Sequence, residues 1–277
     1  MAFKPTYRGI WGLSYPLIVA AVSETVVEVT DTAFLARYGL TELAAIGLAG
    51  ALYAVALFPV VGLVDGIQIT VGRRAGEERP RALGQAFNQG AGLLLAAALL
   101  LIALVVLGLG PATAGLFTLP AVHAAVDDYL TIAILGLPFH ALGLALSAFY
   151  VAIARTRVLI GATAALAVTN IVLDYGLIFG RLGLPELGMQ GAALASVAAE
   201  AAAFAWLLAD AARRGYLRSH ALFRPGRWDG ALARRLLTLS APVSADALVE
   251  SLRWFAFFVL IERLGEATLA RANIVYS

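Results

Sequence analysis

The sequence predicts an all-α, polytopic membrane protein: a six-helix transmembrane bundle followed by the first helices of a second, homologous bundle. Of the 277 residues, 61% are hydrophobic and 14% charged, whereas soluble domains are usually about half apolar and a quarter charged. The apolar residues fall into runs that can cross a bilayer, since about 20 residues at 1.5 Å each span about 30 Å of hydrocarbon. The first of these runs returns near the end of the chain.

Six complete spans are expected before that return. Each is a mainly apolar run bounded by polar or turn-forming residues. The approximate ranges are 7–37, 43–71, 86–109, 128–154, 158–179 and 188–211. The polar segment 72–81 should form the loop between the second and third spans, and the Gly- and Pro-containing segment 110–122 the loop between the third and fourth.

An internal repeat supplies a seventh span at 236–262 and the start of an eighth. Segment 11–39 matches segment 237–265 at one constant offset. The matched pairs include Leu13 and Leu239, Ser14 and Ser240, Pro16 and Pro242, Glu24 and Glu250, Arg37 and Arg263, and Gly39 and Gly265. Internal repeats of this kind are typical of transporter folds.

The repeat divides the chain into three parts: an N-terminal six-helix lobe at 1–211, a basic cytoplasmic linker at 212–234, and the beginning of a C-terminal lobe at 235–277. A complete second lobe would need roughly another 200 residues, and the chain supplies about forty of them. We therefore expect a truncated reading frame. The alternative is a half-transporter that works as a dimer.

Basic residues alternate with the loops. They lie at the N-terminus (Lys4 and Arg8), in segment 72–81, at Arg155 and Arg157, and along the linker, while the intervening loops hold few. The positive-inside rule then places the N-terminus and the linker in the cytoplasm. The expected location is a bacterial or archaeal cytoplasmic (inner) membrane, with the lipid bilayer as the chain's first partner.

An acidic stripe lies within the first span. Glu24, Glu28 and Asp31 are spaced i, i+4, i+7 and so share one helical face. An ionised carboxylate facing lipid costs at least a few kcal/mol, so this face should look onto protein or water. Such a stripe favours ion handling, although Glu24 and Glu28 could line a wet cavity without being essential, and Asp31 could reach the interface beside Arg37.

The fifth span carries Asn170 and Asp174 on one face. A carboxylate with amide and hydroxyl oxygens suits a hard cation such as Na⁺, and a buried aspartate can instead take up a proton. The simpler interpretation is a hydrogen bond that only joins helices. On the seventh span, Glu250 and Arg253 could form a neutralising ion pair.

Four motifs carry a family resemblance: VTDTAFLARYG at 29–39, IQITVGRRAGE at 67–77, NIVLDYGLIFG at 170–180 and GMQGAALAS at 188–196. Together they resemble the multidrug and toxic compound extrusion (MATE) family, most closely its DinF-type prokaryotic branch. The run AIARTR at 152–157 departs from the family's pattern in the loop between the fourth and fifth spans.

The resemblance implies a cation site in the N-terminal lobe. Its matched positions are Asp31, Tyr129, Asn170, Asp174 and Ser196. Without the resemblance, Tyr129 would be an interfacial anchor at the start of the fourth span and Ser196 a packing residue. Candidate cavity-lining acids are Glu24, Glu28, Glu200 and Glu250. No metal is expected beyond Na⁺ at Asp31, Asn170 and Asp174.

The function implied is antiport: a coupling ion, H⁺ or Na⁺, drives export of a small amphiphilic, often cationic, substrate by alternating access. No cofactor and no nucleic-acid partner are expected; the missing C-terminal lobe or a second copy would complete the molecule. The alternative is a lipid-linked oligosaccharide flippase of the same superfamily, for which the acidic N-lobe is ill suited.

An enzyme is not expected. The chain has no cysteine and only three histidines, which are far apart in sequence: His123, His140 and His220. This excludes disulfides and cysteine metal sites. The intramembrane aspartates lack the Gly-x-Gly-Asp setting of an aspartate protease, and no nucleophile elbow is present.

Overall fold

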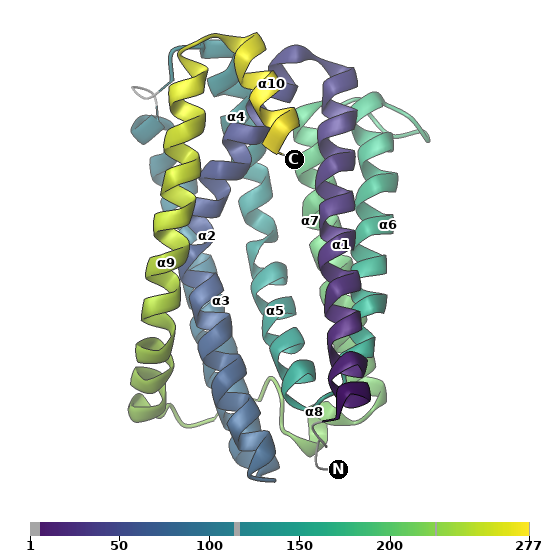
Figure 1. The fold of residues 1–277 in the computed structure, drawn as a ribbon, viewed down its shortest axis with the longest axis vertical. Helices are drawn as coiled ribbons and strands as arrows, with labels where there is room; N and C mark the ends of the chain where they lie inside the picture. Colours follow the sequence, from purple (N-terminus) through teal and green to yellow (C-terminus); the bar gives the residue numbers. More distant parts are fainter. Residues whose placement is uncertain (1–5, 114–116, 225, 277) are drawn as a thin grey trace.

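The structure, a computed structural model, describes residues 6–113, 117–224 and 226–276, and contains no strand in these ranges. Its long helices run side by side as a bundle (Figure 1). The elements are α1 (Tyr7–Tyr38), α2 (Leu40–Gly76), α3 (Pro80–Thr113), α4 (Pro120–Ala133), the 3-10 turn η1 (Ile134–Gly136), α5 (Leu137–Ala152), α6 (Arg157–Phe179), α7 (Met189–Arg213), α8 (Tyr216–Ser219), α9 (Gly230–Glu262) and α10 (Glu266–Tyr276). Lys4 lies outside the described residues.

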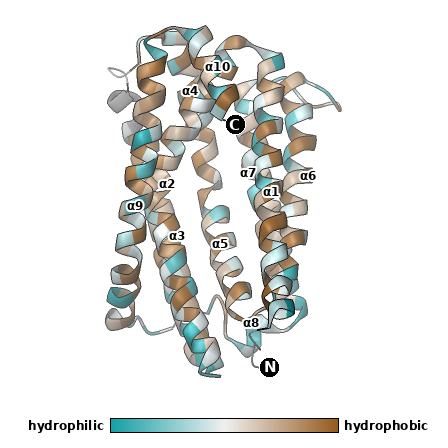
Figure 2. Cartoon of the chain, in the orientation of Figure 1, coloured by the Kyte–Doolittle hydropathy of each residue, from teal (hydrophilic) through white to brown (hydrophobic). Residues whose placement is uncertain are grey.

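Six helical segments are long and apolar enough to cross a membrane. They are α1, α2, the Pro80–Gly108 part of α3, the Pro120–Ala152 unit of α4, η1 and α5, then α6 and α7. Hydrophobic residues cover much of their length (Figure 2). The prediction of an all-α membrane bundle is confirmed. The 33-residue helix α9 has the length of a span but carries Asp246, Glu250 and Arg253 near its middle and is not among the six, so the seventh span stays a prediction.

Three loop predictions were wrong because prolines and caps start helices earlier than the hydropathy suggests. The loop at 72–81 shrinks to 77–79, since α2 continues to Gly76 and α3 begins at Pro80, where a missing N–H costs nothing. Segment 110–122 is partly helical, since α3 reaches Thr113 and α4 begins at Pro120. The Asp229 carboxylate accepts from two backbone N–H groups of the first turn of α9, so that helix begins at Gly230 and not near 236.

The second repeat packs against the first along α2. Helices α2 and α9 share the most extensive contact in the bundle. At Gly62, a Cβ atom would collide with Ser244, and at Gly66 with Ser240. These glycines therefore allow the two helix backbones to approach closely, as small residues do between membrane helices.

One end of the bundle is closed by polar contacts between α9–α10 and the first lobe. The Glu262 carboxylate is fully buried. It accepts hydrogen bonds from the backbone N–H groups of Thr118 (2.7 Å) and Leu119 (2.6 Å) and from the Thr118 hydroxyl (2.9 Å). Nearby, the Asn273 amide donates to the Leu43 carbonyl at 3.1 Å. Figure 1 places this end, with α4 and α10, at the top.

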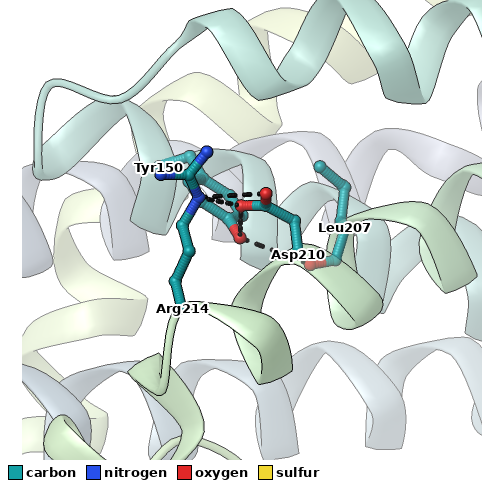
Figure 3. Close-up of polar contacts among 4 residues, drawn as sticks. All are labelled: Tyr150, Leu207, Asp210 and Arg214. Carbon is teal, nitrogen blue, oxygen red and sulfur yellow. Dashed lines mark hydrogen bonds and ion pairs between the residues drawn. The ribbon is translucent and has the colours of Figure 1, made fainter.

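The opposite end gathers the basic segments. Residues of the α2–α3 loop, the α5–α6 loop and the linker line one groove there, and the first turn of α1 and α8 lie at the same end (Figure 1). A polar cluster joins α5 to α7: the Tyr150 hydroxyl donates to Asp210 (2.8 Å) and to the Leu207 carbonyl (3.3 Å), and Arg214 also donates to Asp210 (Figure 3). Grouping at one end is what the positive-inside prediction requires.

Removing the Glu262 carboxylate should destabilise the protein, because two backbone N–H groups and the Thr118 hydroxyl would lose their buried acceptor. For Glu262→Ala we expect a loss of about 2–3 kcal/mol in the free energy of unfolding, measured by thermal melting in detergent. Glu250→Ala is the matched control on the same helix, since no backbone N–H of the described chain is shown to donate to Glu250, whose side chain is exposed and paired with Arg253. Equal melting temperatures for the two variants would contradict the role of Glu262.

Candidate functional site

A cavity of about 730 Å³ opens among α1, α2, α4, α5, α6, α7 and α10. This volume lies in the usual range for small-molecule sites. Its titratable lining is mostly acidic: Glu24, Glu28, Asp31, Asp65, His140 and Glu200. No lysine or arginine of the described chain lines it. The cavity therefore favours a cationic guest.

Asp31, Asn170 and Asp174 meet beside this cavity, where α1 packs against α6. Asn170 and Asp174 are almost completely buried, whereas Asp31 also lines the cavity. In the orientation that satisfies its neighbours, the Asn170 amide nitrogen donates to Asp31 Oδ1 at 2.8 Å and to Asp174 Oδ2 at 3.1 Å. The two carboxyl groups can also hydrogen bond to each other once one is protonated.

The chemistry of this cluster suits a proton or a small cation. Two ionised carboxylates this close repel each other in a poorly solvated site. The Asn170 amide carries no net charge, so it cannot neutralise either of them. The Asp174 Oδ1 atom is buried and has no hydrogen-bond partner among the described residues. A proton or Na⁺ shared by Asp31 and Asp174 would relieve both problems.

Tyr129 and Ser196 complete the set that the sequence predicted. Tyr129 lies about two and a half turns into α4 rather than at the start of its span, because the helix begins at Pro120. Its ring lines the cavity, within hydrogen-bonding reach of Ser196 and close to Asp31 and Asp174. Ser196 donates its own proton to the Ala192 carbonyl at 3.0 Å. The five residues lie together, and their role in cation binding stays a prediction.

Three of the four predicted cavity acids line the cavity, and Glu250 does not. Glu24, Glu28 and Glu200 come from α1 and α7. Glu250 instead forms an ion pair with Arg253 at 2.7 Å, and both side chains are more than 60% exposed. The ion pair that the sequence offered for Glu250 and Arg253 is therefore present, whereas a role for Glu250 in the cavity stays a prediction.

Sequence reasoning missed His140 and Asp65. His140 Nδ1 lies 2.9 Å from Glu200 Oε1, so α5 and α7 are joined by an ion pair whenever the ring is protonated. Glu24 lies close enough to interact electrostatically with both His140 and Glu200. No local spacing shows this pair, because its members lie on different helices. Asp65 could have been found, since a lone carboxylate inside an apolar span is itself a functional signal.

A bundle of membrane helices around a polar cavity with buried carboxylates is typical of secondary transporters. The MatE family model matches residues 16–176, and the chain belongs to this family. The predicted family resemblance is therefore confirmed.

The relatives in sequence are multidrug resistance proteins. The chain is 30% identical over 270 residues to the probable multidrug resistance protein NorM of Aromatoleum aromaticum, covering 95% of this chain and 57% of the relative. It is 31% identical over 271 residues to the multidrug resistance protein NorM of Burkholderia vietnamiensis, covering 95% and 56%. The chain thus spans little more than half the length of these relatives.

Solved structures show the same fold. The MATE multidrug transporter DinF-BH, solved as a complex, superposes with a TM-score of 0.83 at 22% identity, covering 95% of this chain and 58% of that one. An inward-facing MATE family transporter of the MOP superfamily gives a TM-score of 0.75 at 18% identity, covering 94% and 60%.

The Asn170 bridge can be tested by replacing the amide with an apolar side chain of similar size. For Asn170→Leu we expect a loss of about 2 kcal/mol or more in unfolding free energy, because two buried carboxylates lose their shared donor. Thr163→Val on the same helix is the control, since Thr163 bonds only to its own helix at Leu159. Thermal melts of the purified chain that coincide for wild type and Asn170→Leu would contradict the bridge.

Proposed function

We propose that the complete protein is a cation-coupled antiporter, driven by H⁺ or Na⁺, that exports small amphiphilic cations across a prokaryotic cytoplasmic membrane by alternating access. The observation that carries this proposal is the placement of Asp31. It belongs both to the acidic cavity and to the buried cluster with Asn170 and Asp174. Substrate and coupling ion can therefore act on one carboxylate.

Competition at Asp31 gives a mechanism of coupling. A proton or Na⁺ bound between Asp31 and Asp174 lowers the negative charge facing the cavity, which weakens the attraction for a cationic substrate. Substrate bound near Asp31 and Glu28 in turn disfavours the coupling ion. The ion moves substrate only if it binds the inward-open and outward-open states with different affinity.

The names of the relatives support this assignment. NorM proteins are named for multidrug resistance, and DinF-BH is named as a multidrug transporter. The basic end of the bundle supports a cytoplasmic N-terminus and linker. The remaining partner would be a C-terminal lobe or a second copy of this chain.

The flippase alternative receives no support from the cavity. A lipid-linked pyrophosphate would need basic groups to hold its charge. Arg253, a basic residue within the predicted seventh span, is exposed and paired with Glu250 on α9, and does not line the cavity.

The mass of the native protein in the membranes of its source organism would show whether the second lobe belongs to the same chain or to another molecule. A product near roughly 50 kDa would contain two six-helix repeats in one chain. A product near the 29.0 kDa of this chain would require the second lobe to come from another molecule.

Asp31→Asn should abolish efflux of a lipophilic cationic dye, because an amide cannot exchange a proton or offer a full charge to Na⁺. We expect a fall of about tenfold or more in the efflux rate from cells that express the native protein. Asp128→Asn is the control, a carboxylate on α4 beside Tyr129 that does not line the cavity. Normal efflux by Asp31→Asn, at equal protein levels, would end the proposal.

A further inference from the structure

A second pocket, of about 550 Å³, lies at the basic end of the bundle between the first turns of α3 and the linker that leads to α9. Its polar and aromatic lining consists of Arg81, Gln85, Asn88, Gln89, Arg224, Arg227 and Trp228. No acidic residue of the described chain lines it. It is separate from the acidic cavity and shares no residue with it.

Side-chain contacts hold the linker wall of this pocket in place. The Asn88 amide donates to the Ala221 carbonyl at 2.8 Å, and the Gln89 amide donates to the Asp229 carbonyl. The rings of Phe87 and Phe223 pack edge to face with centroids 5.1 Å apart. These contacts hold the linker against α3 on both sides of Arg224 and Arg227. They therefore fix the wall of the pocket that carries these two arginines.

The three arginines of the pocket lack counter-ions. Among the described residues, none of Arg81, Arg224 and Arg227 forms an ion pair. The nearby Asp229 carboxylate is used as the cap of α9. Three guanidinium groups on one pocket favour an anionic ligand, and their planar donor pairs match phosphate oxygens.

The position of the pocket in the bilayer indicates which phosphate is available. The Pro80–Gly108 part of α3 has 29 residues and is about 43 Å long, about 13 Å more than the hydrocarbon core. Its polar residues Arg81, Gln85, Asn88 and Gln89 all lie in its first three turns, so the excess length places this end among the lipid headgroups. Trp228 at the rim is 63% exposed, as is usual for tryptophan at the membrane interface.

We infer that this pocket binds the phosphate headgroup of an anionic phospholipid, with Arg81, Arg224 and Arg227 as its phosphate donors and Trp228 against the lipid. Basic pockets between membrane helices and their cytoplasmic segments take such headgroups. The inference rests on membrane insertion and on the pocket alone, and is independent of the proposed transport function.

The test measures lipid binding by the purified chain in detergent. Phosphatidylglycerol and phosphatidylcholine are titrated separately, and the lipid retained is counted by native mass spectrometry. We expect phosphatidylglycerol to bind at least about tenfold more tightly than phosphatidylcholine, since each basic group near an anionic headgroup contributes about a factor of five. Inorganic phosphate at the same concentration should not displace it.

The pocket variant is Arg81→Gln, Arg224→Gln and Arg227→Gln combined, which should lose the preference. The matched control combines Arg155→Gln, Arg157→Gln and Arg218→Gln, which removes the same charge at the same end from residues outside the pocket, and should keep it. Arg227→Gln alone, on an exposed linker position, should weaken phosphatidylglycerol binding about fivefold if the triple variant does not fold.

Three results would overturn the inference. The first is retention of phosphatidylglycerol by the pocket variants at the wild-type level. The second is an equal loss in the matched control, which would mean general charge attraction. The third is complete displacement by inorganic phosphate, which would mean a site for a soluble anion.

Discussion

The arrangement of the first lobe depends on the cost of placing charge inside a membrane. Asp31 and Asp174 come from two different helices and share one donor, the Asn170 amide. Because an unpaired carboxylate in this environment costs several kcal/mol, α1 and α6 must stay in register for the bridge to form. For the same reason, a proton or Na⁺ bound between Asp31 and Asp174, as proposed above, would change the stability of the α1–α6 contact.

Around that cluster, the bundle is held differently at its two ends. At one end, Glu262 of α9 receives three hydrogen bonds from the segment before α4. At the other, the linker is tied to α3 through Asn88 and Gln89. Between the ends, Gly62 and Gly66 of α2 lie directly against Ser244 and Ser240 of α9, so the two helix backbones approach closely.

The charge distribution separates two chemistries within one molecule. The cavity is lined by Glu24, Glu28, Asp31 and Glu200, and so attracts cations, whereas the pocket beside the linker presents unpaired arginines and so attracts anions. The cavity acids lie within the membrane spans, where an ionised side chain costs free energy unless it faces water or a positively charged partner. By the same inference, the arginines lie at the headgroup level, where a positive charge has a low free-energy cost and helps to orient the protein in the membrane.

The sequence alone determined the helices, the repeat, the family and the residues that share a helical face, because these depend on local spacing and on long apolar runs. It therefore identified Asp31, Asn170 and Asp174 and grouped them by resemblance. Only the tertiary structure decided that Glu250 pairs with Arg253 and is not among the cavity-lining residues, and that His140 meets Glu200. Such relations depend on how each helix is rotated about its axis and packed on its neighbours, and periodicity within one helix carries no information about that rotation.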